Sequence, residues 1–156
     1  MNAGPLLHSI AAALRTARLE AVLVGNAGAA LHGAPVTTLD FDFMFRETPT
    51  NLGKLKRFAA VLGAVVLRPY YPASRMYRVM NDDRGLQVDF LANLHGVRSW
   101  NSLRSRARVV TLGKDEILVA DLADIIASKR AAGRPTDRAV LPVLEETLRE
   151  QEKQKP

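Results

Sequence analysis

Two aspartates in an otherwise apolar stretch are the residues of this sequence best suited to chemistry. Asp40 and Asp42 alternate with three phenylalanines between Thr38 and Phe45, which predicts a β-strand with aromatic rings on one face and carboxylates on the other. Two carboxylates side by side repel each other unless water or a cation screens them. Mg²⁺ suits such a pair, because it prefers oxygen ligands and leaves room for substrate phosphates. A solvent-exposed strand end is the alternative, and the pair alone does not decide between the two.

The segment before this strand is suited to phosphate. Residues 21–25 form a short apolar run that ends in Gly25, which predicts a buried strand entering a turn. Asn26 is expected to cap a short helix over residues 27–31. A turn that leads into a helix N-terminus presents free backbone N–H groups, which can bind phosphate. A phosphate site followed by a carboxylate pair indicates nucleotide chemistry.

A third acid lies on another alternating apolar segment, residues 87–91. If this strand pairs beside the strand that carries Asp40, then Asp89 joins the same site. Two acids on one strand and one on its neighbour match an arrangement for two metal ions.

The stretch from residue 120 to 132 predicts a helix whose apolar stripe contains a lysine. Leu122, Ile125, Ile126 and Lys129 recur at helical spacing, so the lysine is directed inward. A buried lysine is costly unless it meets anions, which the three acids or a bound triphosphate would supply. The alternative is that its side chain extends outward along the helix.

The last helix is expected to start after Gly133, at Arg134-Pro135-Thr136. Asp137 shares a helical stripe with three leucines of this helix, so it also points inward from the first turn. Its carboxylate can hold Lys129 or Arg134 in place as an ion pair.

Composition sets the broad class. The chain has 156 residues, 47% of them hydrophobic, which predicts one domain with a core and excludes a disordered chain. It contains no cysteine, and therefore no disulfide framework and no thiolate zinc site. No signal peptide or membrane span is recognised, so a cytoplasmic location is expected. The net charge of +6 attracts the protein to polyanions.

Three arginines, Arg104, Arg106 and Arg108, are spaced two residues apart. On an extended segment they would share a face and could hold an RNA backbone or a triphosphate. An exposed edge strand kept soluble by its charge explains the same spacing equally well.

In this order, the segments resemble the nucleotidyltransferase superfamily, which has the polymerase-β-like fold. That family has Gly-Gly or Gly-Ser, then Asp-x-Asp, then a third Asp, and the matching stretches here are Leu23–Gly33, Thr38-x-Asp40-x-Asp42 and Val88-Asp89-Phe90. Residues 121–137 resemble the leucine-isoleucine-x-x-Lys … Gly-Arg-Pro-x-Asp segment of small bacterial nucleotidyltransferases, which include the abortive-infection (AbiEii-like) toxins of toxin–antitoxin systems. The matches cover roughly residues 20–145.

The resemblance implies an α+β fold, with a mixed β-sheet flanked by helices and with C-terminal helices, in a single domain over residues 1–156. It implies a Mg²⁺-dependent enzyme, with Mn²⁺ as a possible substitute, that moves NMP from an NTP to an acceptor hydroxyl. Metal binding falls to Asp40, Asp42 and Asp89, which with Lys129 form the catalytic set. Nucleotide binding falls to Gly25, Asn26, Thr38, Lys129, Arg134 and Asp137.

The acceptor implied by the resemblance is tRNA or another RNA, and the implied partner is a cognate antitoxin. A small-molecule acceptor such as an aminoglycoside is the second interpretation, and a degenerate member that binds nucleotide or RNA without turnover is the third. Two departures from the family pattern keep this third interpretation open. Asn26 stands where relatives have Gly or Ser, and Val36 stands where they often have Arg.

Overall fold

A mixed seven-stranded sheet forms the centre of the computed structural model, which describes residues 4–38 and 40–155. Leu39, in the strand predicted between Thr38 and Phe45, lies outside the described residues. The strands are β1 (Val22–Val24), β2 (Asp40–Met44), β3 (Val65–Leu67), β4 (Tyr77–Asn81), β5 (Leu86–Leu91), β6 (Arg108–Leu112) and β7 (Asp115–Val119). Their order across the sheet is β3-β4-β5-β2-β1-β7-β6. β2 pairs in parallel with β5 and antiparallel with β1, so β2 lies in the middle of the sheet.

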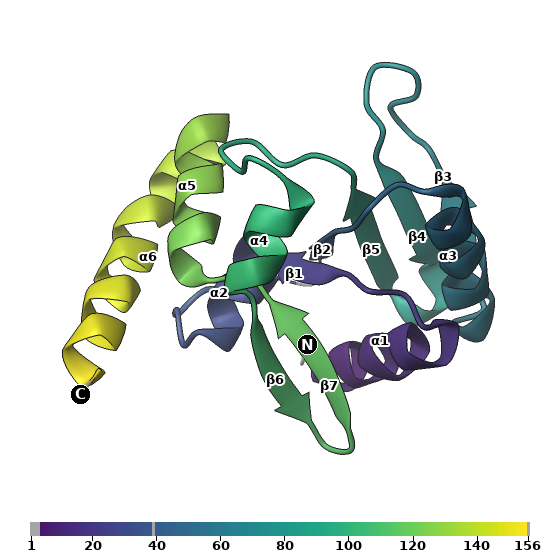
Figure 1. The fold of residues 1–156 in the computed structure, drawn as a ribbon, viewed down its shortest axis with the longest axis horizontal. Coiled ribbons are helices and arrows are strands. Elements are labelled where there is room, and N and C mark those ends of the chain that lie inside the picture. Colours follow the sequence, from purple (N-terminus) through teal and green to yellow (C-terminus); the bar gives the residue numbers. More distant parts are fainter. Residues whose placement is uncertain (1–3, 39, 156) are drawn as a thin grey trace.

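Six α-helices accompany the sheet in the described ranges, as Figure 1 shows. They are α1 (Gly4–Ala17), α2 (Gly25–Leu31), α3 (Pro49–Val61), α4 (Trp100–Arg106), α5 (Leu122–Ala132) and α6 (Pro135–Gln154), with a 3₁₀-helix η1 (Asp82–Arg84) between β4 and β5. The architecture confirms the predicted α+β class with a mixed sheet flanked by helices. No helix of the described part is long and apolar enough to cross a membrane.

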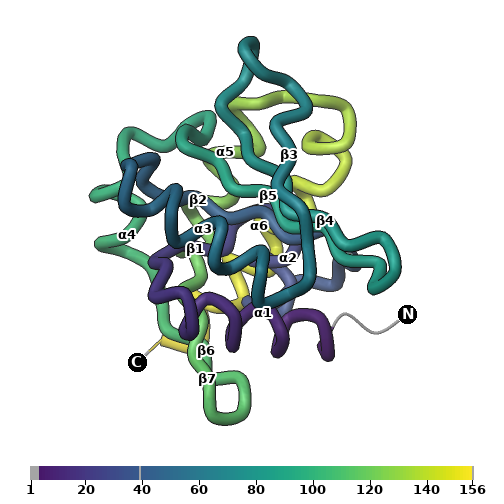
Figure 2. The backbone as a smooth tube through the Cα atoms, turned by 90° about the vertical axis from the view of Figure 1, so that its right-hand side faces the viewer, coloured from purple at the N-terminus to yellow at the C-terminus, as the bar shows by residue number. Residues whose placement is uncertain are grey.

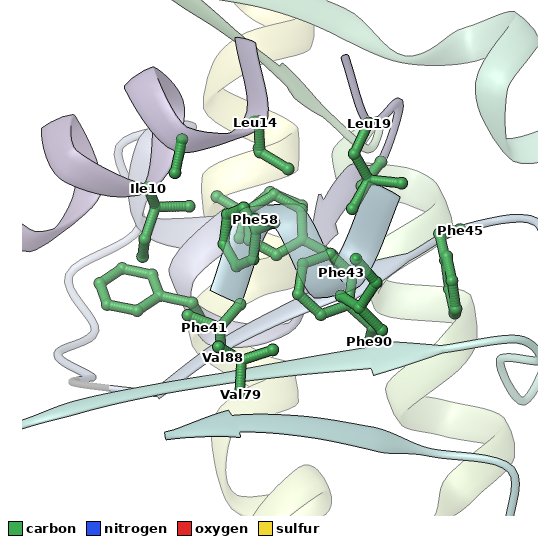
Figure 3. Packing of buried hydrophobic residues seen from close by; sticks show 14 of the residues in the cluster. Ile10, Leu14, Leu19, Phe41, Phe43, Phe45, Phe58, Val79, Val88 and Phe90 are labelled. Atoms are coloured by element: carbon green, nitrogen blue, oxygen red, sulfur yellow. The ribbon is translucent and has the colours of Figure 1, made fainter. Parts of the chain in front are cut away.

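One face of the sheet packs against α1 and α3 through aromatic side chains. The three phenylalanines of the opening motif are all buried on this face, as predicted from their alternation along the strand. Phe90 of β5 lies at the centre of the cluster, with ring centroids 5.6 Å from Phe43, 5.6 Å from Phe45 and 5.2 Å from Phe58 of α3. Figure 3 shows these rings between the sheet and the helices. The aromatic core therefore holds β2 and β5 together from one side.

The opposite face of the sheet packs against the second group of helices. Val22, Val24 and Met44 enter a smaller core with residues of α4, α5 and α6. α5 and α6 lie side by side at one end of the molecule (Figure 1). Because side chains alternate along a strand, Asp40 and Asp42 lie on this same face as Met44.

The loop from residue 68 to residue 76 extends away from the sheet between β3 and β4. Figures 1 and 2 show it projecting from the molecule in two perpendicular views. It follows the edge strand β3, whose three residues are exposed. Tyr70 and Tyr71 in this loop are 54% and 62% exposed.

The arginine spacing did not produce a shared strand face, so that prediction is wrong. Arg104 and Arg106 lie on α4, and only Arg108 lies on a strand. The reason is local: the side chain of Ser99 accepts a hydrogen bond from the backbone N–H of Ser102 and caps a helix that runs on to Arg106.

Each of these arginines forms an ion pair with an acid. The pairs are Arg104–Glu20, Arg106–Asp124 and Arg108–Asp121, at 3.2, 2.9 and 3.1 Å. The surface therefore does not present three uncompensated positive charges to a polyanion.

One helix prediction is also corrected. Helix α2 begins at Gly25 with Val24 as its N-cap, so Asn26 lies in the first turn and does not cap it. Helix α6 continues through Pro142 to Gln154. Leu144, fully buried in the second core, anchors α6 just after the proline, and packing of this kind can outweigh a lost backbone hydrogen bond.

Replacing Phe90 tests the importance of the aromatic core. Phe90→Ala leaves a cavity among three rings, and we expect the free energy of unfolding to fall by about 3–5 kcal/mol. Urea denaturation followed by circular dichroism measures this. Val109→Ala, at a side chain that is 58% exposed, is the control and should have little effect. Equal losses in the two variants would show that Phe90 does not hold the core together.

Candidate active site

A row of side chains across three neighbouring strands forms the base of the site. In the register of the sheet, Asp42 of β2 lies opposite Asp89 of β5, and Asp89 lies opposite Arg78 of β4. Residues opposite each other on paired strands point to the same face. The predicted pairing of the Asp89 strand beside the Asp-x-Asp strand is therefore confirmed.

A cavity of about 340 Å³ opens over this row. An adjoining cavity of about 180 Å³ shares Asp40, Asp42, Lys129 and Arg134 with it. All nine predicted site residues line one cavity or the other: Gly25, Asp40, Asp42, Asp89, Lys129 and Arg134 line the larger, and Asn26, Thr38 and Asp137 line the smaller. The structure thus brings the predicted residues together, while their individual roles stay predictions.

Gly25 allows the turn after β1 to approach the carboxylates. Its φ of +65° lies in the left-handed region, which residues with a side chain rarely adopt. A Cβ atom at this position would lie 3.0 Å from Oδ2 of Asp42. Glycine is therefore required here both for its backbone conformation and for the space beside Asp42.

Burial and the neighbouring carboxylates disfavour the ionised form of Asp42. Its pKa is raised from 3.8 to about 6, first by burial of the carboxyl group and then by the negative charges of Asp89 and Asp40. Lys129 and Arg134 act in the opposite direction without cancelling the rise. A cation placed between these carboxylates would favour their ionised forms.

Lys129 and Arg134 are held in place by one buried carboxylate. Asp137 lies 3.6 Å from Nζ of Lys129 and 2.7 Å from Nε of Arg134, which confirms the predicted ion pairs. Its Oδ2 also accepts a hydrogen bond from the backbone N–H of Arg134, so it fixes the start of α6. The side chain of Lys129 is only 12% exposed, as expected for an inward-directed lysine. Two cations from two helices are thus oriented toward the cavity by a single acid.

Burial alone would raise the pKa of Asp137, but its bonds from Arg134 and the charge of Lys129 outweigh burial and lower it below 3.8. The carboxylate is therefore ionised throughout the neutral range, where the ion pairs contribute to stability.

Asp89 differs from the other two acids because an arginine already binds it. Nε and Nη2 of Arg78 donate to Oδ1 and Oδ2 of Asp89 at 2.9 and 3.1 Å, which is a bidentate pair. The Asp89 side chain is only 9% exposed. Arg78 was not among the predicted site residues. Its signal was present in the sequence, since the hairpin around residues 82–85 sets the register that places residue 78 opposite residue 89.

The donor set fits one divalent cation better than two. Asp40 and Asp42 share one face of β2 and line both cavities, and their oxygens are the kind that Mg²⁺ prefers. The side-chain oxygen of Asn26 lines the smaller cavity, is buried, and accepts no hydrogen bond from any described residue, so it can also face a ligand there. In the described residues, however, no three His, Cys, Asp or Glu side chains form a group able to hold a metal. The Asp40–Asp42–Asp89 metal set therefore stays a prediction, and Asp89 is its weakest member.

Thr38 supports the site through the backbone. Its hydroxyl accepts from the N–H of Asp40 at 3.0 Å and donates to the carbonyl of Asp40 at 3.1 Å. These bonds hold the first residue of β2, so the structure assigns Thr38 a local structural contact beside its predicted nucleotide contact.

The mixed seven-stranded sheet and its flanking helices form a nucleotidyltransferase-like fold, which a solved structure shares. The chain is similar to the solution structure of the antibiotic-resistance factor ANT(2'')-Ia, an aminoglycoside nucleotidyltransferase. The two superpose with a TM-score of 0.63 over 93% of this chain and 83% of that chain, at 13% sequence identity. At the level of sequence, no family model and no curated protein matches.

Replacing Asp137 tests whether it anchors the two cations. Asp137→Asn keeps the cap but removes the carboxylate that is ion-paired with Lys129 and Arg134, and we expect the free energy of unfolding at pH 7 to fall by about 1–3 kcal/mol. Because the folded pKa of Asp137 lies below 3.8, its contribution is present above that pH and is lost as the pH falls further. The difference between the two proteins should therefore shrink below about pH 4.

Urea denaturation of both proteins at several pH values provides this measurement. Glu146→Gln, which removes an exposed ion pair with Arg149, is the matched control and should change nothing measurable. A difference that persisted unchanged at pH 2 would contradict an electrostatic role for Asp137.

Proposed function

We propose that the protein is a nucleotidyltransferase that moves NMP from an NTP to an acceptor hydroxyl and releases pyrophosphate. The observation that supports this most directly is the convergence of Asp40, Asp42 and Asp89 with Lys129 in one cavity of a nucleotidyltransferase-like fold. Phosphoryl transfer needs positioning and charge compensation more than covalent chemistry from the protein, and this cavity offers both.

The triphosphate occupies the side of the cavity near α2 and α5. Lys129 and Arg134, both anchored by Asp137, supply positive charge there. Gly25 and Asn26 begin α2 and offer backbone N–H groups to the outer phosphates. These contacts orient the α-phosphate toward the carboxylates.

Asp40 and Asp42 would hold Mg²⁺, or Mn²⁺ in its place. Bound there, the ion would compensate the negative charge that develops on the phosphates during transfer. The close approach of Gly25 to Asp42 keeps the phosphate-binding turn and the carboxylate pair in contact.

Asp89 receives the proton of the acceptor hydroxyl. Arg78 occupies one lone-pair position on each of its oxygens, and a carboxylate has others to offer. The acceptor oxygen forms a bond to the α-phosphorus, the bond to pyrophosphate breaks, and the proton passes to Asp89. The arrangement of donors and charges, rather than a covalent intermediate, accounts for the rate.

RNA, and tRNA in particular, is the acceptor class that we favour. The acceptor side of the larger cavity carries Arg78 and Tyr70. In the adjacent loop, the guanidinium of Arg68 lies 4.0 Å from the ring centroid of the exposed Tyr71. Exposed aromatic rings beside arginines suit unpaired nucleotides, whose bases stack and whose phosphates are anionic. The overall charge of +6 agrees.

An aminoglycoside is the second acceptor class, and the fold similarity to ANT(2'')-Ia favours it. Such an acceptor is polycationic and needs free carboxylates. Arg78 neutralises Asp89 on the acceptor side of the cavity, which argues against a cation there.

The resemblance of residues 121–137 to small bacterial toxins supports a role as the toxin of a toxin–antitoxin pair, with a cognate antitoxin as partner. The alternative is a degenerate member that binds nucleotide or RNA without turnover, with Asn26 and Val36 as the departures behind it.

A labelling assay tests the proposed reaction. Protein, Mg²⁺, total tRNA or kanamycin, and each α-labelled NTP in turn are incubated with wild type, Asp42→Asn and Asp83→Asn. We expect label in tRNA, reduced by at least about 100-fold in Asp42→Asn and unchanged in Asp83→Asn, whose side chain lies in the exposed turn η1. Label in kanamycin instead would select the second acceptor class.

The same variant also has an expected effect on stability. Asp42 has a raised pKa, so its ionised form destabilises the fold at pH 7, and Asp42→Asn should be at least as stable as the wild type. In the labelling assay, full activity of Asp42→Asn would contradict the proposed site. No label on any acceptor, with NTP binding intact by calorimetry, would support the degenerate alternative.

A further inference from the structure

Among the described residues of the site, Arg78 is the cation that forms an ion pair with a predicted metal ligand. It comes from β4, on the side of Asp89 away from Asp42, and its guanidinium engages both oxygens of that carboxylate. The pairing raises the pKa of Arg78, chiefly through the hydrogen bonds from its side chain to Asp89, so the group stays charged at any working pH.

We propose that the guanidinium of Arg78 takes the place of a second divalent cation at Asp89. The site then holds one metal ion, on Asp40 and Asp42, and Arg78 is a positioning residue for Asp89. This inference rests on the proposed function, because it concerns the same carboxylates.

The geometry of the pair supports a permanent arrangement. Arg78 and Asp89 are register partners on adjacent antiparallel strands, so the backbone itself sets their separation. The guanidinium is planar and matches the two carboxylate oxygens, which a lysine or a hydrated ion would not do in the same way. Both side chains are largely buried, at 22% and 9% exposure, so water does not compete strongly for the pair. A dication bound to Asp89 would lie next to a fixed positive charge.

The charge balance of the cavity also indicates that it binds one metal ion. Three carboxylates and the Arg78 guanidinium leave two negative charges, which one divalent ion compensates. Lys129 and Arg134 share the single negative charge of Asp137, so together they add one positive charge to the same cavity, where both also lower the pKa of Asp42. A second dication would leave the carboxylate side with an excess of positive charge.

The fold also distinguishes Arg78 from its neighbour Arg75. Arg75 pairs with Glu47 outside the larger cavity, and its side chain is 68% exposed. Arg75→Gln is therefore a matched control that removes an ion-paired arginine of the same region without touching the carboxylates.

The test counts Mn²⁺ ions by electron paramagnetic resonance, with and without the α,β-methylene analogues of the four NTPs. We expect one ion per wild-type chain with an analogue bound, one in Arg78→Lys, one in Arg75→Gln and two in Arg78→Gln. The double variant Arg78→Gln/Asp89→Asn should again bind one Mn²⁺ ion per chain. Circular dichroism and urea denaturation establish that each variant is folded.

The single variant Asp89→Asn, which keeps Arg78, provides a second test that does not depend on the folding of Arg78→Gln. If Asp89 ligates no metal in the wild type, this change leaves Mn²⁺ affinity within about twofold, whereas removal of even an outer-shell partner of a bound metal weakens affinity by about 10- to 100-fold. Asp42→Asn supplies the reference for loss of a ligand.

The outcomes separate this inference from the proposed function. Two ions per wild-type chain, or a 10-fold loss of affinity in Asp89→Asn, would overturn the role of Arg78 while leaving nucleotidyl transfer intact. A folded Arg78→Gln that still binds one ion would overturn it as well. A wild-type chain that binds neither Mn²⁺ nor any analogue would overturn the proposed function, and this inference with it.

Discussion

The repulsion between Asp42 and Asp89 is the physical constraint around which the site is built. Parallel pairing of β2 with β5 places these carboxylates directly opposite each other on a partly buried face. Burial strengthens that repulsion, so nearby cations must compensate it. Arg78 arrives from the same sheet, while Lys129 and Arg134 arrive from the C-terminal helices.

The unfavourable charges are tolerated because the other face of the same strands is strongly stabilised. Phe43 and Phe90, register partners on β2 and β5, stack at 5.6 Å in the aromatic core, one residue along from the acids. Side-chain alternation thus gives each strand one face for stability and one for chemistry. A rigid sheet also keeps the carboxylates at fixed separations, which a flexible loop would not do.

The residues proposed to hold the nucleotide and the loop proposed to meet the acceptor come from different parts of the sheet, although Tyr70 of that loop lines the same cavity as the carboxylates. The carboxylates lie on central strands, whereas the projecting loop over residues 68–76 belongs to the edge of the sheet. Loops of this kind vary without disturbing the core, which is how one fold can serve different acceptors. Similarity to ANT(2'')-Ia in fold therefore does not identify the acceptor of this chain.

Local periodicity accounts for what the sequence determined by itself. Alternation in β2 separated the phenylalanines from Asp40 and Asp42, and helical spacing placed Lys129 and Asp137 on inward faces, where their ion pair lies. The turn residues between β4 and β5 are also typical of a hairpin, whose register places Arg78 opposite Asp89.

Only the tertiary structure decided which distant segments meet. The adjacency of β2 and β5 and the pairing of Arg104 and Arg106 with acids depend on contacts between segments far apart in the chain. Strand order and ion-pair partners follow from packing of the whole chain, which no local pattern encodes. The sequence therefore determined the chemistry on each face, and the fold decided which charges neutralise one another.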